Sequence, residues 1–183
     1  SPIIAQDSTV FVGNSQGGIL GGAASAISTE WKRAVLGVPG MNYSLLLPRS
    51  SDWPQFQVAY EAAYLESQDR LMALVLAQLL WDRGENSGYA QHLSTNPYPG
   101  IEKKDVLLVG AFGDHQVANV STEVLARTIG ARVHSPALQD GRSSDVVPLW
   151  GIEPITYPYS GTALVMWDYG TPAPPIGPEP PNE

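Results

Sequence analysis

The amino-acid sequence predicts an α/β fold in which a mostly parallel sheet is flanked by helices. Strand-like and helix-like segments alternate along the chain, beginning at residues 9–13, 19–27 and 33–38. A strand, a helix and a second buried strand with short connections form a βαβ unit, whose two strands are parallel. The length of 183 residues and the 43% of hydrophobic residues suit one globular domain with a substantial core.

Each of the first predicted elements has a local cause. Residues 9–13 (TVFVG) are β-branched or aromatic and stop at a glycine-rich turn, which indicates a strand. The small residues of 19–27 indicate a helix. Residues 33–38 (RAVLGV) indicate a second buried strand, which a Pro-Gly pair ends.

Two helices are predicted next, over residues 52–65 and 68–83, with Pro54 tolerated in the first turn of the first one. The second helix is apolar on most of its circumference, so we expect most of it to be covered. The cover is the core, a subunit or a piece of protein absent from this chain. The apolar residues of this helix are Leu71, Met72, Leu74, Val75, Leu76, Leu79 and Leu80.

The strongest buried-strand signal lies in residues 105–112 (DVLLVGAF). A helix over residues 117–129 follows, and Gly130 is predicted to cap its C-terminus. The stretch 86–104 between these elements and the preceding helices is polar and rich in turn residues, so it is predicted as a loop.

The last third of the chain has shorter signals. Residues 132–134 begin a short strand, and a turn-rich stretch separates it from residues 155–159 and from the apolar run 163–167. The predicted organisation is one domain over 1–171 with a helical, cap-like segment at 52–84, and a proline-rich extended or disordered tail at 172–183.

Composition excludes several functions. The chain has 10 Lys and Arg against 18 Asp and Glu, a net charge of −8, and no clustered basic residues, which argues against nucleic acid as a partner. The absence of Cys excludes disulfides and thiolate chemistry but suits either redox compartment. No apolar run reaches the roughly 18 residues of a membrane span, so no membrane partner is expected. The acidic residues and histidines lack ligand spacing, so no metal is expected.

The turn after the first strand carries the most specific motif. Residues 13–17 (GNSQG) fit G-x-S-x-G between a strand and a helix, the context of a nucleophile elbow. Glycines beside Ser15 permit a strained turn whose Oγ projects from the sheet edge, and the N–H of Gln16 at the helix start is placed to stabilise an oxyanion. The alternative is a glycine-rich turn, such as one that binds phosphate, but the segment lacks the P-loop lysine.

Asp114 and His115 follow the strongest predicted strand. A carboxylate at the carboxyl end of a central parallel strand lies where open α/β sheets place their sites. Asp114 is therefore a candidate to orient a histidine and stabilise its imidazolium. The alternative is that Asp114 caps the following helix and His115 is a solvated neighbour.

In these two segments the sequence resembles the α/β-hydrolase superfamily of esterases, lipases and peptidases. The run VGNSQGG around Ser15 matches the nucleophile elbow, and residues 110–117 (GAFGDHQV) with the following helix look like the acid loop. The resemblance covers roughly residues 8–133 and keeps the order of serine before aspartate. The resemblance implies that Ser15 is the nucleophile, that Asp114 is the acid and that the N–H of Gln16 is an oxyanion donor. It also implies helical cap segments before the acid strand, and no cofactor.

The resemblance also implies missing parts. The family's sheet has about eight strands, its elbow follows the fifth, and its histidine follows the last. This chain begins at the elbow strand and has no histidine beyond His134. We therefore expect the carboxyl-terminal part of the fold, with a companion fragment or a homo-oligomer covering the edge of the elbow strand.

Three histidines are candidates for the base. His115 is adjacent to the predicted acid, and His134, just after a short strand, is the alternative, although it could equally be a core residue. His92 lies in the polar loop and is the weakest candidate. A histidine supplied by residues or a chain not present here is the remaining possibility.

The sequence thus predicts a serine hydrolase of esterase type that transfers the acyl group of a small-molecule ester to Ser15 and then hydrolyses it. The alternative is a non-catalytic α/β binding or structural subunit that retains the elbow geometry. Such a subunit would work through its exposed sheet edge and its proline-rich arm.

Overall fold

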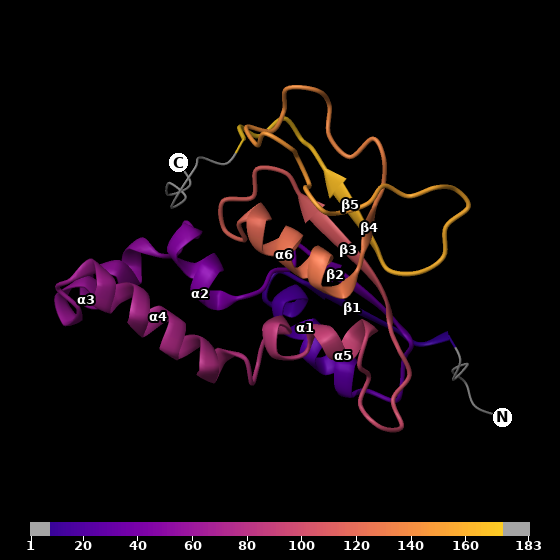
Figure 1. Ribbon diagram of the computed structural model, residues 1–183, viewed down its shortest axis with the longest axis horizontal. Helices are drawn as coiled ribbons and strands as arrows, with labels where there is room; N and C mark the ends of the chain where they lie inside the picture. The colour runs from indigo at the N-terminus through magenta and orange to yellow at the C-terminus, as the bar shows by residue number, and fades with distance from the viewer. Residues whose placement is uncertain (1–7, 174–183) are drawn as a thin grey trace.

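The structure, a computed structural model, describes residues 8–173 and contains one five-stranded sheet in the order β1-β2-β3-β5-β4 (Figure 1). Every pairing is parallel, so the predicted α/β class is confirmed. The elements are β1 Val10–Asn14, α1 Gln16–Ile27, β2 Arg33–Gly37, α2 Tyr43–Leu46, η2 Leu47–Arg49, α3 Pro54–Ala63, α4 Ser67–Trp81, η3 Asn86–Gly88, α5 Ala90–Ser94, β3 Asp105–Ala111, α6 Asn119–Ile129, β4 Arg132–Val133 and β5 Ala163–Trp167.

One face of the sheet is buried under α1, α5 and α6 (Figure 1). Leu36, Leu108 and Leu164 lie level with one another on the three central strands of this face and are fully buried. No helix of the described chain buries the opposite face, where Val12 is 71% and Leu107 is 37% exposed. Because all-parallel sheets are usually covered on both faces, this exposed face is unusual.

A buried lysine ties the chain before β3 to the end of α1. Lys104 is almost fully buried, and its Nζ donates hydrogen bonds to the carbonyls of Ser28 and Trp31 at 2.7 and 2.6 Å. These carbonyls follow the C-terminus of α1, where a cation is favoured by the helix dipole. Burial lowers the pKa of Lys104 from its ordinary value. The two hydrogen bonds therefore offset part of the cost of burying the ammonium group.

Two predictions about local structure were wrong. The stretch 86–104 is not all loop, because it contains η3 and α5, and α5 buries Ala90 and Leu93 against the core. Residues 155–159 form no strand, and the nearest ladder contact is an isolated bridge between Val133 and Pro154.

Helices α2, α3 and α4 project to one side of the sheet (Figure 1). The sequence places two helices here, and the structure gives them narrower bounds than predicted. The described part of the chain leaves most of the apolar side chains of α4 exposed, and the buried residue of this helix is Gln78.

A tail was predicted at residues 172–183, and all of it after residue 173 lies outside the described residues. Among the described helices, none has the length and apolarity that crossing a bilayer requires.

Candidate active site

The five parallel strands all have their carboxyl ends at the same edge of the sheet, and the predicted site residues follow two of them. Ser15 comes directly after β1, and Asp114 lies in the turn after β3. The strand between them, β2, ends level with β1, since Asn14 pairs with Gly37. Two strand spacings, about 10 Å, separate β1 from β3. The structure therefore places Ser15 and Asp114 at the same sheet edge with one strand between them.

Ser15 occupies a backbone conformation that serine rarely adopts. Its φ is 55° and its ψ is −120°, and a positive φ of this kind in a non-glycine residue costs about 1–3 kcal/mol. The amide of Ser15 donates to the carbonyl of Gly37 at 3.0 Å, which fixes the turn against the neighbouring strand. A serine that caps a helix normally has an extended backbone and bonds an N–H of the first turn, but Ser15 makes no such side-chain bond. Its side chain is therefore not used as a helix cap.

The glycines around Ser15 have different roles. A Cβ on Gly13 would lie 2.2 Å from the carbonyl oxygen of Gly17, and one on Gly18 would lie 2.4 Å from that of Gly37. Both positions therefore require glycine. At Gly17 a Cβ would meet nothing within 4 Å, so the prediction that both glycines flanking the serine are sterically required holds for Gly13 and fails for Gly17.

The start of α1 places the N–H of Gln16 where the motif predicts an oxyanion donor. Gln16 is the first residue of α1, and its N–H has no acceptor within the helix. Ser15 contributes the carbonyl that accepts from Gly18 and Ile19 at 2.8 and 3.0 Å. The N-terminal end of the helix dipole thus lies beside the Ser15 side chain, and an anion formed there is stabilised.

Asn86 anchors α1 behind the turn. Its side chain is fully buried, accepts from the amide of Gly22 at 2.9 Å and donates to the carbonyls of Gly18 and Gly40 at 3.0 and 3.1 Å. All the polar atoms of the amide are therefore paired with backbone groups from α1 and from the segment after β2. The sequence analysis did not single out this residue, because its partners lie 46 to 68 residues away.

The turn after β3 presents Asp114 in a fixed orientation. Its Oδ1 accepts from the amides of Gln116 and Val117, both at 2.8 Å, whereas its Oδ2 accepts no hydrogen bond from the described residues. Asp114 does not cap α6 directly, because that helix begins at Asn119 and its N-cap is Ala118. The Asx-type turn therefore orients the carboxylate and leaves one oxygen available.

His115 lies beside Asp114 and is half-buried. Its carbonyl accepts from the amide of Ser51 at 2.8 Å, and Gln116 Nε2 donates to a carboxylate oxygen of Asp52 at 2.9 Å. The segment that leads into α3 is thus attached to the turn after β3, and His115 is held between these two pieces of chain.

A third loop, after β5, packs on the turn that carries Asp114. A Cβ on Gly113, whose φ is 78°, would lie 2.8 Å from Thr171 and from the carbonyl oxygen of Pro172. The Asn119 side chain also accepts from the amide of Gly113 at 2.8 Å and donates to the carbonyl of Ala111 at 2.6 Å. The turns after β3 and β5 therefore form one packed unit.

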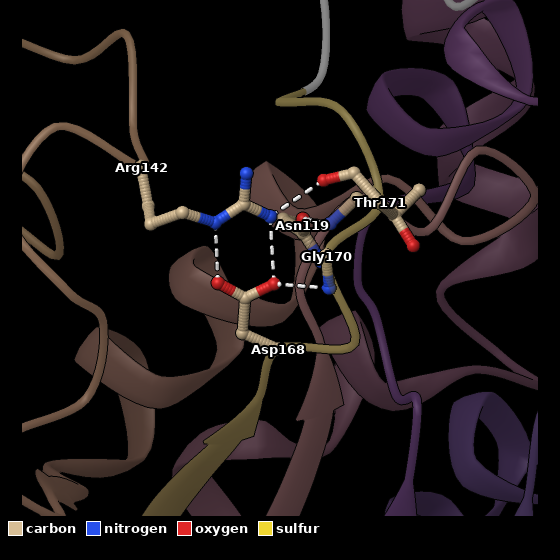
Figure 2. Close-up of polar contacts among 6 residues, drawn as sticks. Asn119, Arg142, Asp168, Gly170 and Thr171 are labelled. Carbon is tan, nitrogen blue, oxygen red and sulfur yellow. Dashed lines mark hydrogen bonds and ion pairs between the residues drawn. The ribbon is translucent and has the colours of Figure 1, made fainter.

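Figure 2 shows an ion pair that orders the loop after β5. Arg142 donates from Nε and Nη2 to the two carboxylate oxygens of Asp168 at 2.5 and 2.6 Å, and from Nη2 to the carbonyl of Thr171 at 2.6 Å. The bonds from Arg142, together with one from the amide of Gly170, lower the pKa of Asp168 to about 2. The guanidinium also lies 5.0 Å from the ring centre of Phe112. Sequence reasoning missed this pair, since 26 residues separate its members.

The structure does not bring His134 or His92 to Ser15. His134 follows β4, and β4 and β1 are the outermost strands on opposite sides of the sheet. Four strand spacings, about 19 Å, separate these two strands. Its Nδ1 is paired with the hydroxyl of Tyr157. His92 lies in α5 and stacks on Tyr98. His115 is thus the histidine of the described chain that lies in the same turn as Asp114.

A surface pocket lies away from the predicted nucleophile and acid. It has a volume of about 560 Å³ and lies between α6 and residues 143–150, with Phe112 and Asn119 in its wall. Neither Ser15 nor Asp114 lines it. Burial raises the pKa of Glu123 in this pocket, and Arg127, 3.3 Å away, opposes that effect. Within residues 8–173 no group of three or more histidine, aspartate or glutamate side chains is arranged to hold a metal ion.

Comparisons of the chain with protein-family models, with curated proteins and with solved structures give no match.

Proposed function

We propose that the chain carries the nucleophile and the acid of a serine hydrolase of esterase type, similar to the α/β-hydrolases. The observation that supports this most is the conformation of Ser15, whose positive φ is retained at a cost although the side chain caps nothing. Strain at a strand-to-helix turn is typical of a nucleophile elbow. The Oδ2 of Asp114, which accepts no hydrogen bond from the described residues, lies two strands away at the same edge and supports the role of an acid that orients a base.

In the proposed reaction the Oγ of Ser15 attacks the carbonyl carbon of a small-molecule ester. A histidine takes the serine proton, and the N–H of Gln16 donates to the oxyanion. The C–O bond to the alcohol then breaks, the alcohol leaves with the proton, and the acyl group remains on Ser15. Water attacks the acyl-serine, which releases the carboxylic acid and restores the hydroxyl.

The base is proposed to be His115 or a histidine of a companion segment. His115 lies next to Asp114 in sequence, so bonding that carboxylate and reaching Ser15 at the same time is sterically demanding. A companion is also supported by the sheet, because β1 is an edge strand in the described chain and Val12 is largely exposed. Such a segment would pair with β1 and cover the exposed face. The same exposed surface favours the second candidate function, a binding subunit without catalysis.

Labelling with a fluorophosphonate separates the two functions. An activated serine displaces fluoride, so Oγ–P forms, P–F breaks and the base takes the proton. We expect mass spectrometry of the protein isolated in its native assembly to find the label on Ser15. Ser15→Ala should abolish labelling, and Ser143→Ala, at a position in the loop between β4 and β5, should not. A folded native assembly in which Ser15 stays unlabelled overturns the enzymatic proposal.

The identity of the base is tested with a matched pair of histidine variants. If His115 is the base, His115→Ala lowers the rate of p-nitrophenyl ester hydrolysis by about 100-fold or more, and His134→Ala leaves it unchanged. If both variants retain the rate of the unaltered protein, the base is supplied from outside this chain.

A further inference from the structure

One face of α4 is apolar, exposed and bounded by a charge at each end. The side chains of Leu71, Met72, Val75, Leu76, Leu79 and Leu80 are each more than half exposed. They form two adjacent rows, in which each residue is followed by the one four positions later, and such residues are neighbours on a helix surface. An exposed apolar stripe of this length is typical of an interaction surface.

The opposite face of α4 already has its partner. Gln78 is buried, accepts from the amide of Ser44 at 2.9 Å and donates to Glu85 at 2.6 Å. Trp81 contacts the ring of Tyr43 with a centroid distance of 5.8 Å. The helix is therefore fixed to α2 by its inner face, and the apolar stripe points away from the rest of the described chain.

Leu76 lies near the middle of the stripe, and opposite charges lie at equal sequence distances on either side of it. Asp69, Leu76 and Arg83 follow one another at intervals of seven residues, which places them on nearly the same side of a helix. Asp82 keeps helical backbone angles, and the amide of Arg83 donates to the carbonyl of Leu80, so a tighter turn carries the chain from the last residue of α4 to Arg83. The side chains of Asp69 and Arg83 are exposed and make no ion pair with the described residues.

These charges cannot neutralise each other within one chain. Fourteen residues of helix extend about 21 Å, far beyond the reach of an ion pair. In a second copy that packs antiparallel about a two-fold axis through Leu76, Asp69 of each chain meets Arg83 of the other. Met72 then lies against Leu80, because both are four residues from Leu76. The row of Met72, Leu76 and Leu80 and the two charges beyond it are thus complementary to their own reverse, as an isologous interface requires.

We propose that the chain forms a two-fold homodimer through the outer face of α4, with Leu76 at the axis and an Asp69–Arg83 pair at each end. The apolar stripe supplies the affinity, and the two ion pairs select the antiparallel orientation. This interface is separate from the edge of β1 and does not depend on the proposed function.

Sedimentation velocity over a range of concentrations tests the dimer with charge-reversal variants. Asp69→Lys alone, or Arg83→Glu alone, places like charges together at both ends and weakens the dimer by about tenfold or more. The double variant restores the order of opposite charges and regains the affinity. An equimolar mixture of the two single variants forms a heterodimer, because the lysine introduced in one chain then faces the glutamate introduced in the other. Both positions are exposed, and unchanged circular dichroism controls for folding.

A single-cysteine variant tests the axis independently, since the chain has no native Cys. Leu76→Cys is expected to cross-link to a second copy with a short bis-maleimide, whereas Val146→Cys, at a fully exposed residue in a loop, does not at the same concentration. Three results overturn the proposal. They are a monomer at all concentrations up to about 100 μM, a dimer that survives both single reversals, and a dimer lost only on Val12→Lys at the edge of β1.

Discussion

The two glycines that flank Asn14-Ser15-Gln16 are expected to respond to alanine in opposite directions. Gly13→Ala places a Cβ 2.2 Å from the carbonyl oxygen of Gly17, whereas Gly17→Ala places one in open space. Side-chain rotation cannot relieve the first contact, because the opposing atom belongs to the backbone at the start of α1. Restoring an ordinary separation requires β1 and α1 to move apart by about 1 Å.

That movement opposes the hydrogen bond from Ser15 to Gly37 and the packing of α1, and it is expected to cost about 3 kcal/mol. Gly17→Ala, near the start of a helix, should instead stabilise the protein by up to about 1 kcal/mol, since alanine has the higher helix propensity. Thermal unfolding followed by circular dichroism should show Gly13→Ala lowering Tm by about 6–12 °C and Gly17→Ala raising it by up to about 4 °C. Equal effects of the two substitutions, or an unaffected Gly13→Ala, would refute the steric reasoning.

Two further predictions concern residues that the sequence alone did not single out. Asn86→Ala leaves three buried backbone groups without partners and should lower the free energy of unfolding by about 3 kcal/mol in urea titrations. Asn86→Asp should lose at least as much, because a carboxylate cannot donate to the carbonyls of Gly18 and Gly40 and its charge is buried. Asp168→Asn removes the partner of Arg142. Because the pKa of Asp168 is lowered from 3.8 to about 2 in the folded protein, its contribution is present above about pH 4 and lost as the pH falls towards 2. The difference in Tm between Asp168→Asn and the unaltered protein should therefore shrink over that interval, and a difference that is constant with pH contradicts the role of the ion pair.

The strands of the sheet were predictable because their signals are local. Residues of β3 alternate between the buried and exposed faces within an apolar run, and β1 ends in a motif that itself encodes a strand-to-helix turn. Helix α5 was missed because it contributes only Ala90 and Leu93 to the core within a polar stretch. Two apolar positions do not establish a helical period.

The candidate site was predictable in part for the same reason. The motif around Ser15 identifies the strand-to-helix turn, and the strand before Asp114 shows at which edge of the sheet this residue lies. The side chains that hold these turns in place, however, come from distant parts of the sequence. Asn86 reaches Gly18 across 68 residues, and Arg142 reaches Asp168 across 26. Pairing over such separations leaves no periodic trace in a single sequence. The exposed face of α4 was partly anticipated, since its apolar composition was expected to need a cover and the described chain does not supply one.

The position of β1 at the edge of the sheet has a consequence for motion. Among the described strands β1 has a neighbour on one side only, so it can open from β2 at a lower free energy than β3, which lies between β2 and β5 and precedes Asp114. Opening of this kind displaces Ser15 while the turn after β3 stays in place. A strand added to the outer side of β1 would slow amide exchange there. It would also control how long Ser15 remains at the same sheet edge as Asp114, without contacting either residue.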